Sequence, residues 1–159
     1  MIEAGVRYAT EDDIPEIVRV INAAYRVEDF FVRGNRTSAE DVAARMISPG
    51  GCFLVADRGD GVLIGATSVD VHDDRGHFAM LAVDPSVQGR GYGRIMIDAV
   101  EAHCRKAGCV HLDIEVVNLR EELPAFYERF GFVTTTTAQF SDTGKLTREA
   151  HLVLMTKPI

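Results

Sequence analysis

The chain has 159 residues, 47% of them apolar and 26% charged, and this makeup predicts one globular domain over residues 1–159 with its own hydrophobic core. Its net charge of −7 disfavours a nucleic-acid partner, because phosphate binding needs a basic face and the 17 lysines and arginines are scattered. No uncharged apolar run approaches the ~20 residues of a membrane helix, and residues 1–4 do not resemble the start of an export signal. We therefore expect a cytoplasmic protein that does not bind a membrane.

The cysteines and other metal-binding residue types form no recognisable site. Cys52, Cys104 and Cys109 are an odd number at spacings that match no zinc pattern, so we expect reduced core residues. Histidines and carboxylates do not recur at a zinc-like spacing either. We expect no metal cofactor.

The first half of the chain predicts two helices and four strands. A short strand over Val6–Ala9 precedes Thr10, which is a suitable N-cap for an amphipathic helix that runs to about Tyr25. Ser38 begins a second short helix, and Pro49 follows its end. Tight turns then join three strands, over Cys52–Asp57, Val62–Val71 and Gly76–Val83, into an antiparallel meander.

The second half alternates helices and strands. A strong helix is predicted from Gly91 to Lys106, ended by Gly108. The remaining elements are a strand over Val110–Val117, a helix over Glu121–Phe130 and strands over Phe132–Thr137 and Glu149–Thr156. This order predicts a mixed α/β sheet with helices packed over it.

The segment Gln88-Gly89-Arg90-Gly91-Tyr92-Gly93 joins a strand to a helix and is suited to bind a diphosphate. Glycines allow close approach of the backbone, and a helix N-terminus offers unpaired amides with a partial positive charge. Arg90 and Arg94 add charge at the rim. The G-x-G-x-G spacing and the lack of a G-K-[ST] sequence disfavour nicotinamide and nucleoside-triphosphate sites. From these residues alone, a glycine-rich turn that only begins a helix remains an alternative.

Two motifs resemble those of the GNAT (GCN5-related N-acetyltransferase) superfamily. Gln88-x-x-Gly91-x-Gly93, preceded by an apolar strand, looks like the family's acyl-CoA pyrophosphate motif. Asn118 and the later run Ala125-Phe126-Tyr127, which ends in Gly131-Phe132, resemble its second motif, slightly compressed relative to the common spacing. The two motifs occur in the family's order, and the resemblance extends over nearly the whole chain.

The resemblance implies a fold, an activity and a cofactor. The implied fold is a central, mostly antiparallel twisted sheet flanked by helices, with the fourth and fifth strands splayed apart. The implied activity is transfer of an acetyl group from acetyl-CoA to a primary amine of a small molecule or peptide, by direct attack on the thioester. A non-catalytic acyl-CoA sensor is the alternative, and a homodimer is left open.

The resemblance also implies roles for particular residues. The backbone of Leu81–Val83 would pair with the pantetheine arm, and Asn118 would contact the same arm. Tyr127 is the expected general acid for the leaving thiolate, although its helical spacing with Phe126 also fits a core aromatic residue. The expected cofactor-binding residues are Leu81, Ala82, Val83, Gln88, Gly89, Arg90, Gly91, Tyr92, Gly93, Arg94, Asn118 and Tyr127.

The general base and the acceptor are less well defined. Many relatives carry a Glu on the fourth strand, but residues 76–81 contain none. Glu115 is the leading substitute, followed by His77, His72 and Asp70, and a water chain without a single base remains open. The expected acceptor wall, residues 25–36 and 134–148, mixes acidic, basic and aromatic side chains and does not select one class of amine.

Overall fold

The computed structural model describes residues 5–141 and 143–159. Residues 1–4, where no export signal was expected, and Asp142, within the expected acceptor wall, lie outside the described residues. Among the residues described, no helix is both long enough and apolar enough to cross a bilayer.

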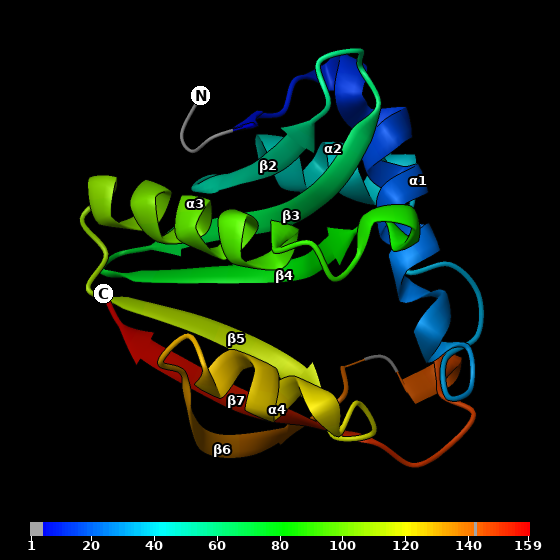
Figure 1. Ribbon diagram of the computed structural model, residues 1–159. Helices are drawn as coiled ribbons and strands as arrows, with labels where there is room; N and C mark the ends of the chain where they lie inside the picture. The colour runs from blue at the N-terminus through cyan, green and yellow to red at the C-terminus, as the bar shows by residue number, and fades with distance from the viewer. Residues whose placement is uncertain (1–4, 142) are drawn as a thin grey trace.

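Within this part of the chain, seven strands form one sheet in the order β1-β2-β3-β4-β5-β7-β6 (Figure 1). Neighbouring strands are antiparallel except β4 and β5, which are parallel and are joined by a helical crossover. The sheet is therefore mixed and mostly antiparallel, as predicted. The strands are β1 Val6–Tyr8, β2 Gly51–Asp57, β3 Leu63–His72, β4 Arg75–Val83, β5 His111–Val117, β6 Val133–Gln139 and β7 His151–Pro158.

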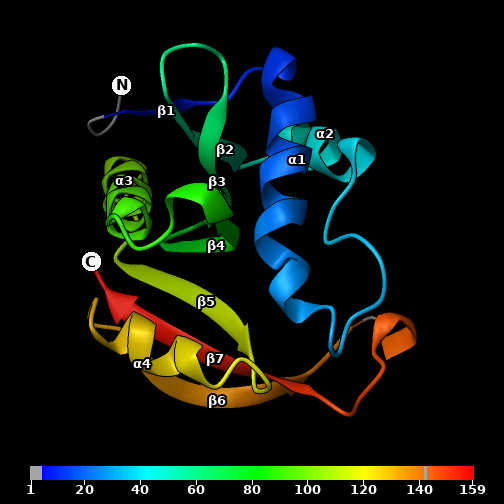
Figure 2. The same ribbon diagram turned by 45° about the vertical axis from the view of Figure 1, so that its right-hand side comes forward.

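Helices cover both faces of the sheet. Helices α1 and α2 lie on one face of the β2–β4 half, while α3 lies on the other face and α4 lies over β5 and β7 (Figures 1 and 2). The α-helices are α1 Ile14–Ala24, α2 Ala39–Ile47, α3 Tyr92–Lys106 and α4 Glu122–Glu128, and short 3-10 turns span Glu11–Asp13, Tyr25–Glu28, Pro85–Val87 and Thr143–Lys145. The predicted elements are all present, with ends that differ by a few residues.

Strand β2 is buried on both faces, and this explains why its sequence is apolar at successive positions. Phe53 and Val55 pack against α1 and α2, whereas Leu54 and Ala56 pack on the α3 side. A strand buried on both faces needs apolar residues at every position. The two resulting cores fix α1 and α3 on opposite sides of the sheet.

A β-bulge interrupts β4 at Met80. Met80 has φ +56°, and the register between β3 and β4 shifts opposite Thr67. The Thr67 hydroxyl donates to the Ala79 carbonyl at 3.0 Å. Residues two apart on a regular strand share a face, but Phe78 belongs to the α3-side core and Met80 to the α1-side core. The bulge therefore turns the backbone of the strand that follows, where Leu81 lies.

Strands β4 and β5 separate soon after they meet. Their ladder contains only the pairs Arg75↔His111, Gly76↔Leu112 and His77↔Asp113. Beyond His77 the two strands diverge and divide the sheet into a β1–β4 half and a β5–β7–β6 half (Figure 1). The splay implied by the family resemblance is thus present.

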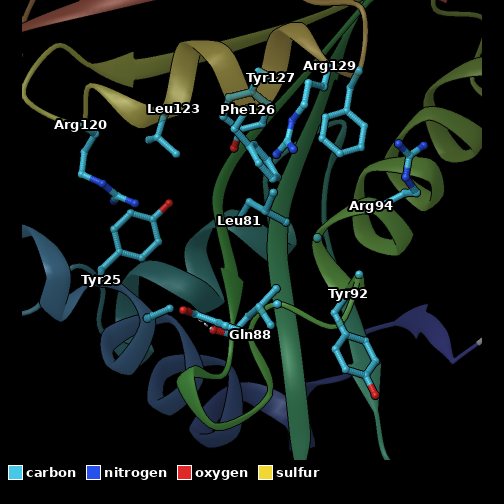
Figure 3. A pocket seen from close by; sticks show the side chains of 16 residues that line it. Tyr25, Leu81, Gln88, Tyr92, Arg94, Arg120, Leu123, Phe126, Tyr127 and Arg129 are labelled. Carbon is cyan, nitrogen blue, oxygen red and sulfur yellow. Dashed lines mark hydrogen bonds between the residues drawn. The ribbon is translucent and has the colours of Figure 1, made fainter.

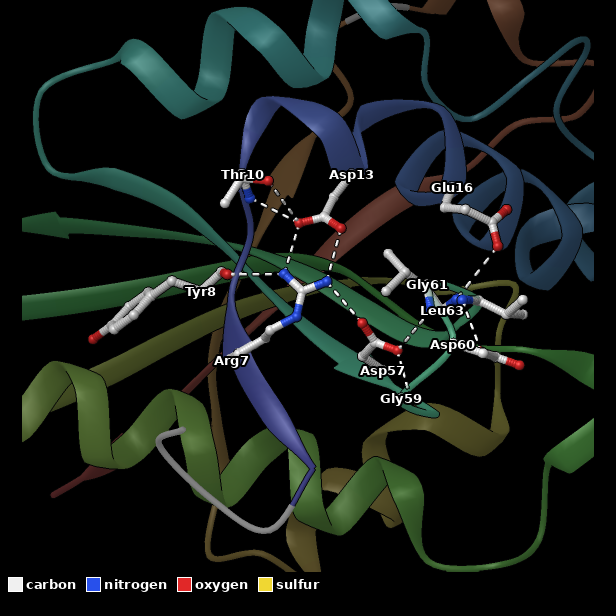
Figure 4. A network of polar contacts seen from close by, with 11 residues as sticks. Arg7, Tyr8, Thr10, Asp13, Glu16, Asp57, Gly59, Asp60, Gly61 and Leu63 are labelled. Atoms are coloured by element: carbon white, nitrogen blue, oxygen red, sulfur yellow. Dashed lines mark hydrogen bonds and ion pairs between the residues drawn. The ribbon is translucent and has the colours of Figure 1, made fainter.

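A network of charged side chains fastens the N-terminal strand to the rest of the fold (Figure 4). The Arg7 guanidinium donates to Asp13 at 2.7 and 2.8 Å and to Asp57 at 2.9 Å. The hydrogen bonds from Arg7 are the main cause that lowers the pKa of Asp13 and of Asp57. Asp13 also accepts the N–H of Thr10 at 2.8 Å and so closes the turn before α1.

Candidate functional site

The loop between β4 and α3 has the backbone that a phosphate-binding turn requires. Gly89 and Gly91 have φ values of +80° and +86°, which residues with a side chain rarely adopt. A Cβ added at either glycine would meet no atom within 4 Å, so the loop faces open space. Gln88 donates from its side-chain amide to the Val83 carbonyl at 3.0 Å and closes the loop on the end of β4.

The N-terminus of α3 is left without a side-chain cap. Gly91 is the N-cap residue and offers no side chain to the first turn. The amides of that turn therefore have no capping acceptor from the N-cap and are available to an anion. This arrangement is suited to an anion, and the binding of a diphosphate at this helix N-terminus stays a prediction.

A first cavity of about 600 Å³ extends from this loop along β4 to α4. Figure 3 shows Phe126 and Tyr127 of α4 on the side of the cavity opposite Gln88 of the loop. Arg94 stacks on the ring of Phe130 at 4.9 Å and Arg129 on that of Phe126 at 5.4 Å. The residues around this cavity are Ala24, Tyr25, Leu81, Val83, Gln88, Gly89, Gly91, Tyr92, Gly93, Arg94, Arg120, Leu123, Phe126, Tyr127, Arg129 and Phe130.

A second cavity of about 810 Å³ opens between the splayed strands. Its walls include residues 77–81 of β4, residues 114–117 of β5, the segment between α1 and α2, and residues near the 3-10 turn at 143–145. Both expected acceptor-wall segments thus contribute to it. The two cavities share Tyr25, Leu81, Leu123 and Tyr127, so they meet where β4 and β5 part.

Tyr127 combines a buried ring with a hydroxyl that opens at this junction. The residue is 8% exposed, and its ring makes edge contacts with Phe78, Phe126 and Phe132. Burial raises the pKa of the phenol above its usual value, so the hydroxyl keeps its proton at neutral pH. Within the described chain the hydroxyl has no hydrogen-bond partner. Tyr127 is both a core aromatic residue and a free donor at the junction.

A second phenol, Tyr25, lies across the cleft from Tyr127 (Figure 3). Burial raises the pKa of Tyr25 to about 12. Nearby, Arg120 donates to Glu28 at 2.9 Å and to Glu122 at 2.7 Å. Glu28 is 7% exposed, and burial raises its pKa despite the Arg120 partner. Since Arg120 already holds the Glu28 carboxylate, Glu28 is less available to an acceptor ammonium.

The candidate bases fall into two groups. Glu115 and His77 both line the second cavity, with His77 Nε2 3.8 Å from Glu115 Oε1. Asp70 and His72 lie at the far end of β3 and line neither cavity. Glu115 therefore keeps its place as the leading candidate, and His77 is its neighbour on the adjacent strand.

Most of the expected cofactor-binding residues lie together around the first cavity, but three do not. Ala82 points into the core on the α1 side because its side chain alternates with that of Leu81. Arg90 is exposed outside the cavity lining. Asn118 accepts the His151 N–H at 2.8 Å and ties β5 to β7. A cofactor contact stays a prediction for all the expected residues, these three included.

Some cavity residues were not expected from the sequence. Arg120, Leu123 and Arg129 had no expected role, and Tyr25 was expected only in the acceptor wall. The aromatic pattern of α4 was the only local signal near them. No group of three or more His, Cys, Asp and Glu side chains in residues 5–141 and 143–159 is arranged to hold a metal ion.

The splayed sheet, the uncapped helix N-terminus and the two joined cavities define a mixed α/β fold with a site suited to a phosphate-bearing ligand. Comparison with known proteins identifies the group within this class. The model of the acetyltransferase (GNAT) family matches residues 18–132, so the chain belongs to that family.

Named relatives and solved structures agree with this assignment. The mycothiol acetyltransferases of Propionibacterium freudenreichii subsp. shermanii and Gordonia bronchialis are 32% and 33% identical over 80% and 79% of this chain. The chain spans 42% of the length of each.

Among structures, the ribosomal-protein-S18-alanine N-acetyltransferase of Escherichia coli has a TM-score of 0.77 at 18% identity, covering 97% of this chain and 92% of that one. The yncA structure from Salmonella typhimurium, solved with its cofactor acetyl-CoA, has a TM-score of 0.74 at 19% identity, covering 96% and 92%. At these identities the two structures show the shared fold.

Proposed function

We propose that this protein is an N-acetyltransferase that moves the acetyl group of acetyl-CoA to a primary amine of a small molecule or peptide. The observation that carries the proposal is the meeting of the two cavities at Tyr25, Leu81, Leu123 and Tyr127. A thioester at this junction is reachable from both sides, by the cofactor arm through the first cavity and by an amine through the second. Membership of the GNAT family supports the same reaction.

The first cavity is suited to the cofactor along its whole length. The glycine loop and the uncapped α3 N-terminus would hold the diphosphate, with Arg94 and Arg129 near the outer end. Beyond His77, β4 has no ladder partner on its β5 side, so its backbone is free to pair with the pantetheine amides. Leu81 lies just after the bulge and faces the junction.

The protein's own residues would support attack of the amine on the thioester. Acetyl-CoA supplies an activated acetyl group and a thiolate leaving group. A β4 backbone N–H near Leu81 would donate to the carbonyl oxygen as negative charge develops there. The Tyr127 hydroxyl would donate its proton toward the departing sulfur, and its high pKa keeps that proton in place beforehand.

The amine must lose a proton before or during attack, because an alkylamine with a pKa near 10.4 is almost fully protonated at neutral pH. Glu115 lines the second cavity beside His77, and we propose that it accepts this proton, directly or through water. His77 would position the Glu115 carboxylate.

Several broader features belong to the same proposal. We propose that residues 1–159 act as one acetyltransferase domain, without a metal, in the cytoplasm. The net charge of −7 supports the view that neither nucleic acid nor a membrane surface is a partner. A homodimer is compatible with the exposed outer strand β6. The relatives' name points to a small-molecule acceptor.

A thiol-release assay with acetyl-CoA and a panel of amines tests the proposal. We expect amine-dependent release of the CoA thiol together with an acetylated product of matching mass. Cofactor binding without turnover on any amine would contradict the enzyme proposal and favour the sensor alternative.

A further inference from the structure

Two cationic side chains in the second cavity, Arg36 and Lys145, form no close ion pair, although Arg36 lies within Coulombic range of Glu28 and Asp41. Arg36 is half-buried and lies over the ring of Tyr25, with 5.3 Å between its Cζ and the ring centroid. Lys145 lines the same cavity from the 3-10 turn at 143–145. In the described chain, neither side chain has a hydrogen bond or an ion pair with a carboxylate.

Two carboxylates of this cavity form close ion pairs with other arginines, and Arg36 acts on them only at longer range. Glu28 is held by Arg120 at 2.9 Å. Asp41 accepts from Arg45 at 3.1 Å and from the Thr37 hydroxyl at 2.7 Å.

Glu115 is the remaining carboxylate of the cavity, and it lies on β5 beside His77 in the wall formed by the strands. The cavity therefore presents a carboxylate on its strand wall and, on its loop wall, two cations without a close ion pair, of which Arg36 is only at longer range from Glu28 and Asp41.

The loop wall is held in place by backbone contacts. The segments around Val32 and Leu146 form an isolated bridge. The Arg33 N–H donates to the Lys145 carbonyl at 2.8 Å, and the Thr147 N–H donates to the Phe31 carbonyl at 2.9 Å. Arg36 and Lys145 thus come from two segments that are fastened together into one wall.

The Arg36 guanidinium makes no hydrogen bond within the described chain, so its donors are available to a ligand anion. Arg presents a planar set of donors that matches a carboxylate in a two-point contact. Stacking on Tyr25 restricts the guanidinium of Arg36 beside the junction of the two cavities. A ligand that enters the second cavity would bring such an anion next to the site of acetyl transfer.

We propose that the acceptor carries a carboxylate as well as its amine, and that Arg36, assisted by Lys145, binds this carboxylate. The inference rests on the proposed N-acetyltransferase function. It makes Arg36 a specificity-determining residue for amino-acid-like acceptors, with the amine directed toward Glu115 and the thioester. A phosphate on the acceptor presents the same oxygen chemistry, so the experiment includes it separately.

The test compares matched amines with and without the anion. Thiol release is measured with an amino acid or dipeptide and with the corresponding C-terminal amide, corrected for the fraction of unprotonated amine. Ethanolamine and phosphoethanolamine form the second pair. We expect kcat/KM for the carboxylate form to exceed that of the amide by about tenfold or more, as for a hydrogen-bonded charge pair.

Three variants test which side chain is responsible for the preference for the carboxylate form. Arg36→Met keeps the length of the side chain without its charge, and we expect it to lower the carboxylate-to-amide ratio by about tenfold, mainly through KM. Lys145→Met should lower the ratio by a smaller factor. Arg33→Met is the matched control, because Arg33 lies in the same loop with an exposed side chain outside the cavity. It should leave the ratio unchanged.

Four results would overturn the inference. Equal kcat/KM for the carboxylate and amide forms of the acceptor in the parent protein would show that the site does not recognise a carboxylate. A selectivity confined to phosphoethanolamine would assign the cations to a phosphate. A folded, acetyl-CoA-binding Arg36→Met variant that loses activity equally on all amines would assign Arg36 to holding Tyr25. Failure of every amine to release thiol would overturn the proposed function itself, and this outcome is distinguishable from the first three.

Discussion

Tyr127 is the residue at which the enzyme and sensor interpretations differ most. Its ring packs against Phe78, Phe126 and Phe132, while its hydroxyl opens at the junction of the two cavities. Tyr127→Phe keeps the ring and removes only the donor. Because general acid catalysis is typically worth about 10² to 10⁴-fold, we expect kcat to fall by a factor in this range while the Kd for acetyl-CoA changes little. Steady-state thiol release and calorimetry measure the two quantities.

Tyr8→Phe is the control for the loss of a hydroxyl. Tyr8 is 45% exposed, its hydroxyl contacts His103 at 2.8 Å, and it lines neither cavity. This variant should retain the parental kcat. A Tyr127→Phe protein with at least half the parental kcat would show that the role of Tyr127 is purely structural.

At the scale of elements, the prediction of acetyl-CoA binding depends on the loop that leads into α3. Gly91 has φ +86° and is the N-cap of α3. Gly91→Val introduces a branched side chain that strains this conformation and occupies the space in front of the helix N-terminus. We expect the affinity for acetyl-CoA to fall by about 100-fold or more, measured by calorimetry. The strain should also lower the free energy of unfolding by about 1–3 kcal/mol.

Gly108→Val separates strain from the loss of the binding site. Gly108 follows the other end of α3, has φ +90°, and also has no atom within 4 Å of an added Cβ. It should lose a similar amount of stability and bind acetyl-CoA like the parent. Normal binding by a folded Gly91→Val protein would refute the assignment of the loop to the diphosphate.

The charged network between β1 and the rest of the fold predicts an acid-sensitive stability. The pKa of Asp13 is lowered in the folded protein, chiefly by hydrogen bonds from Arg7. A carboxyl with a lowered folded pKa stabilises the fold above its unfolded pKa, near 3.9, and loses this contribution as the pH falls through the lower, folded pKa. Asp13→Asn should lower the free energy of unfolding by about 1–3 kcal/mol at pH 7. The difference in this free energy between variant and parent should shrink below about pH 4.

Denaturant unfolding at several pH values measures this difference. Asp29→Asn is the control, since Asp29 is exposed and its nearest arginine, Arg26, is 3.9 Å away. Its stability change should stay within about 0.5 kcal/mol at every pH. A parent-to-variant difference for Asp13→Asn that does not vary between pH 7 and pH 3 would contradict the ionic account.

At the scale of the whole molecule, acetyl-CoA is expected to join the two halves of the splayed sheet. The β1–β4 half carries the glycine loop, and the β5–β7–β6 half carries α4 with Tyr127 and Arg129. A ligand at 100 times its Kd stabilises a protein by about 2.7 kcal/mol, which corresponds to a rise in Tm of about 5–10 °C for this size. Thermal unfolding with acetyl-CoA should show this rise, whereas NAD and ATP should not match it. An unchanged Tm in millimolar acetyl-CoA would contradict the cofactor proposal.

The sequence by itself determined the features that depend on neighbouring residues. The glycine loop, the start of α3 and the element order were predictable because turn dihedrals, caps and hydrophobic periodicity are set within a few residues. Tyr127 was singled out only through its resemblance to a family motif, since local spacing fitted a core residue equally well.

The tertiary structure alone decided where those residues meet. The sequence of β4 predicts a regular strand, yet the structure contains a bulge at Met80 that redirects the backbone. The bulge is not predictable from β4 alone, because strand register depends on packing against β3. Tyr25 reaches the junction, and Arg36 lies over its ring without a close ion pair, through contacts that the local sequence does not show. The splay of β4 from β5 likewise depends on tertiary packing, because their ladder ends after three pairs although one core cluster spans both halves of the sheet.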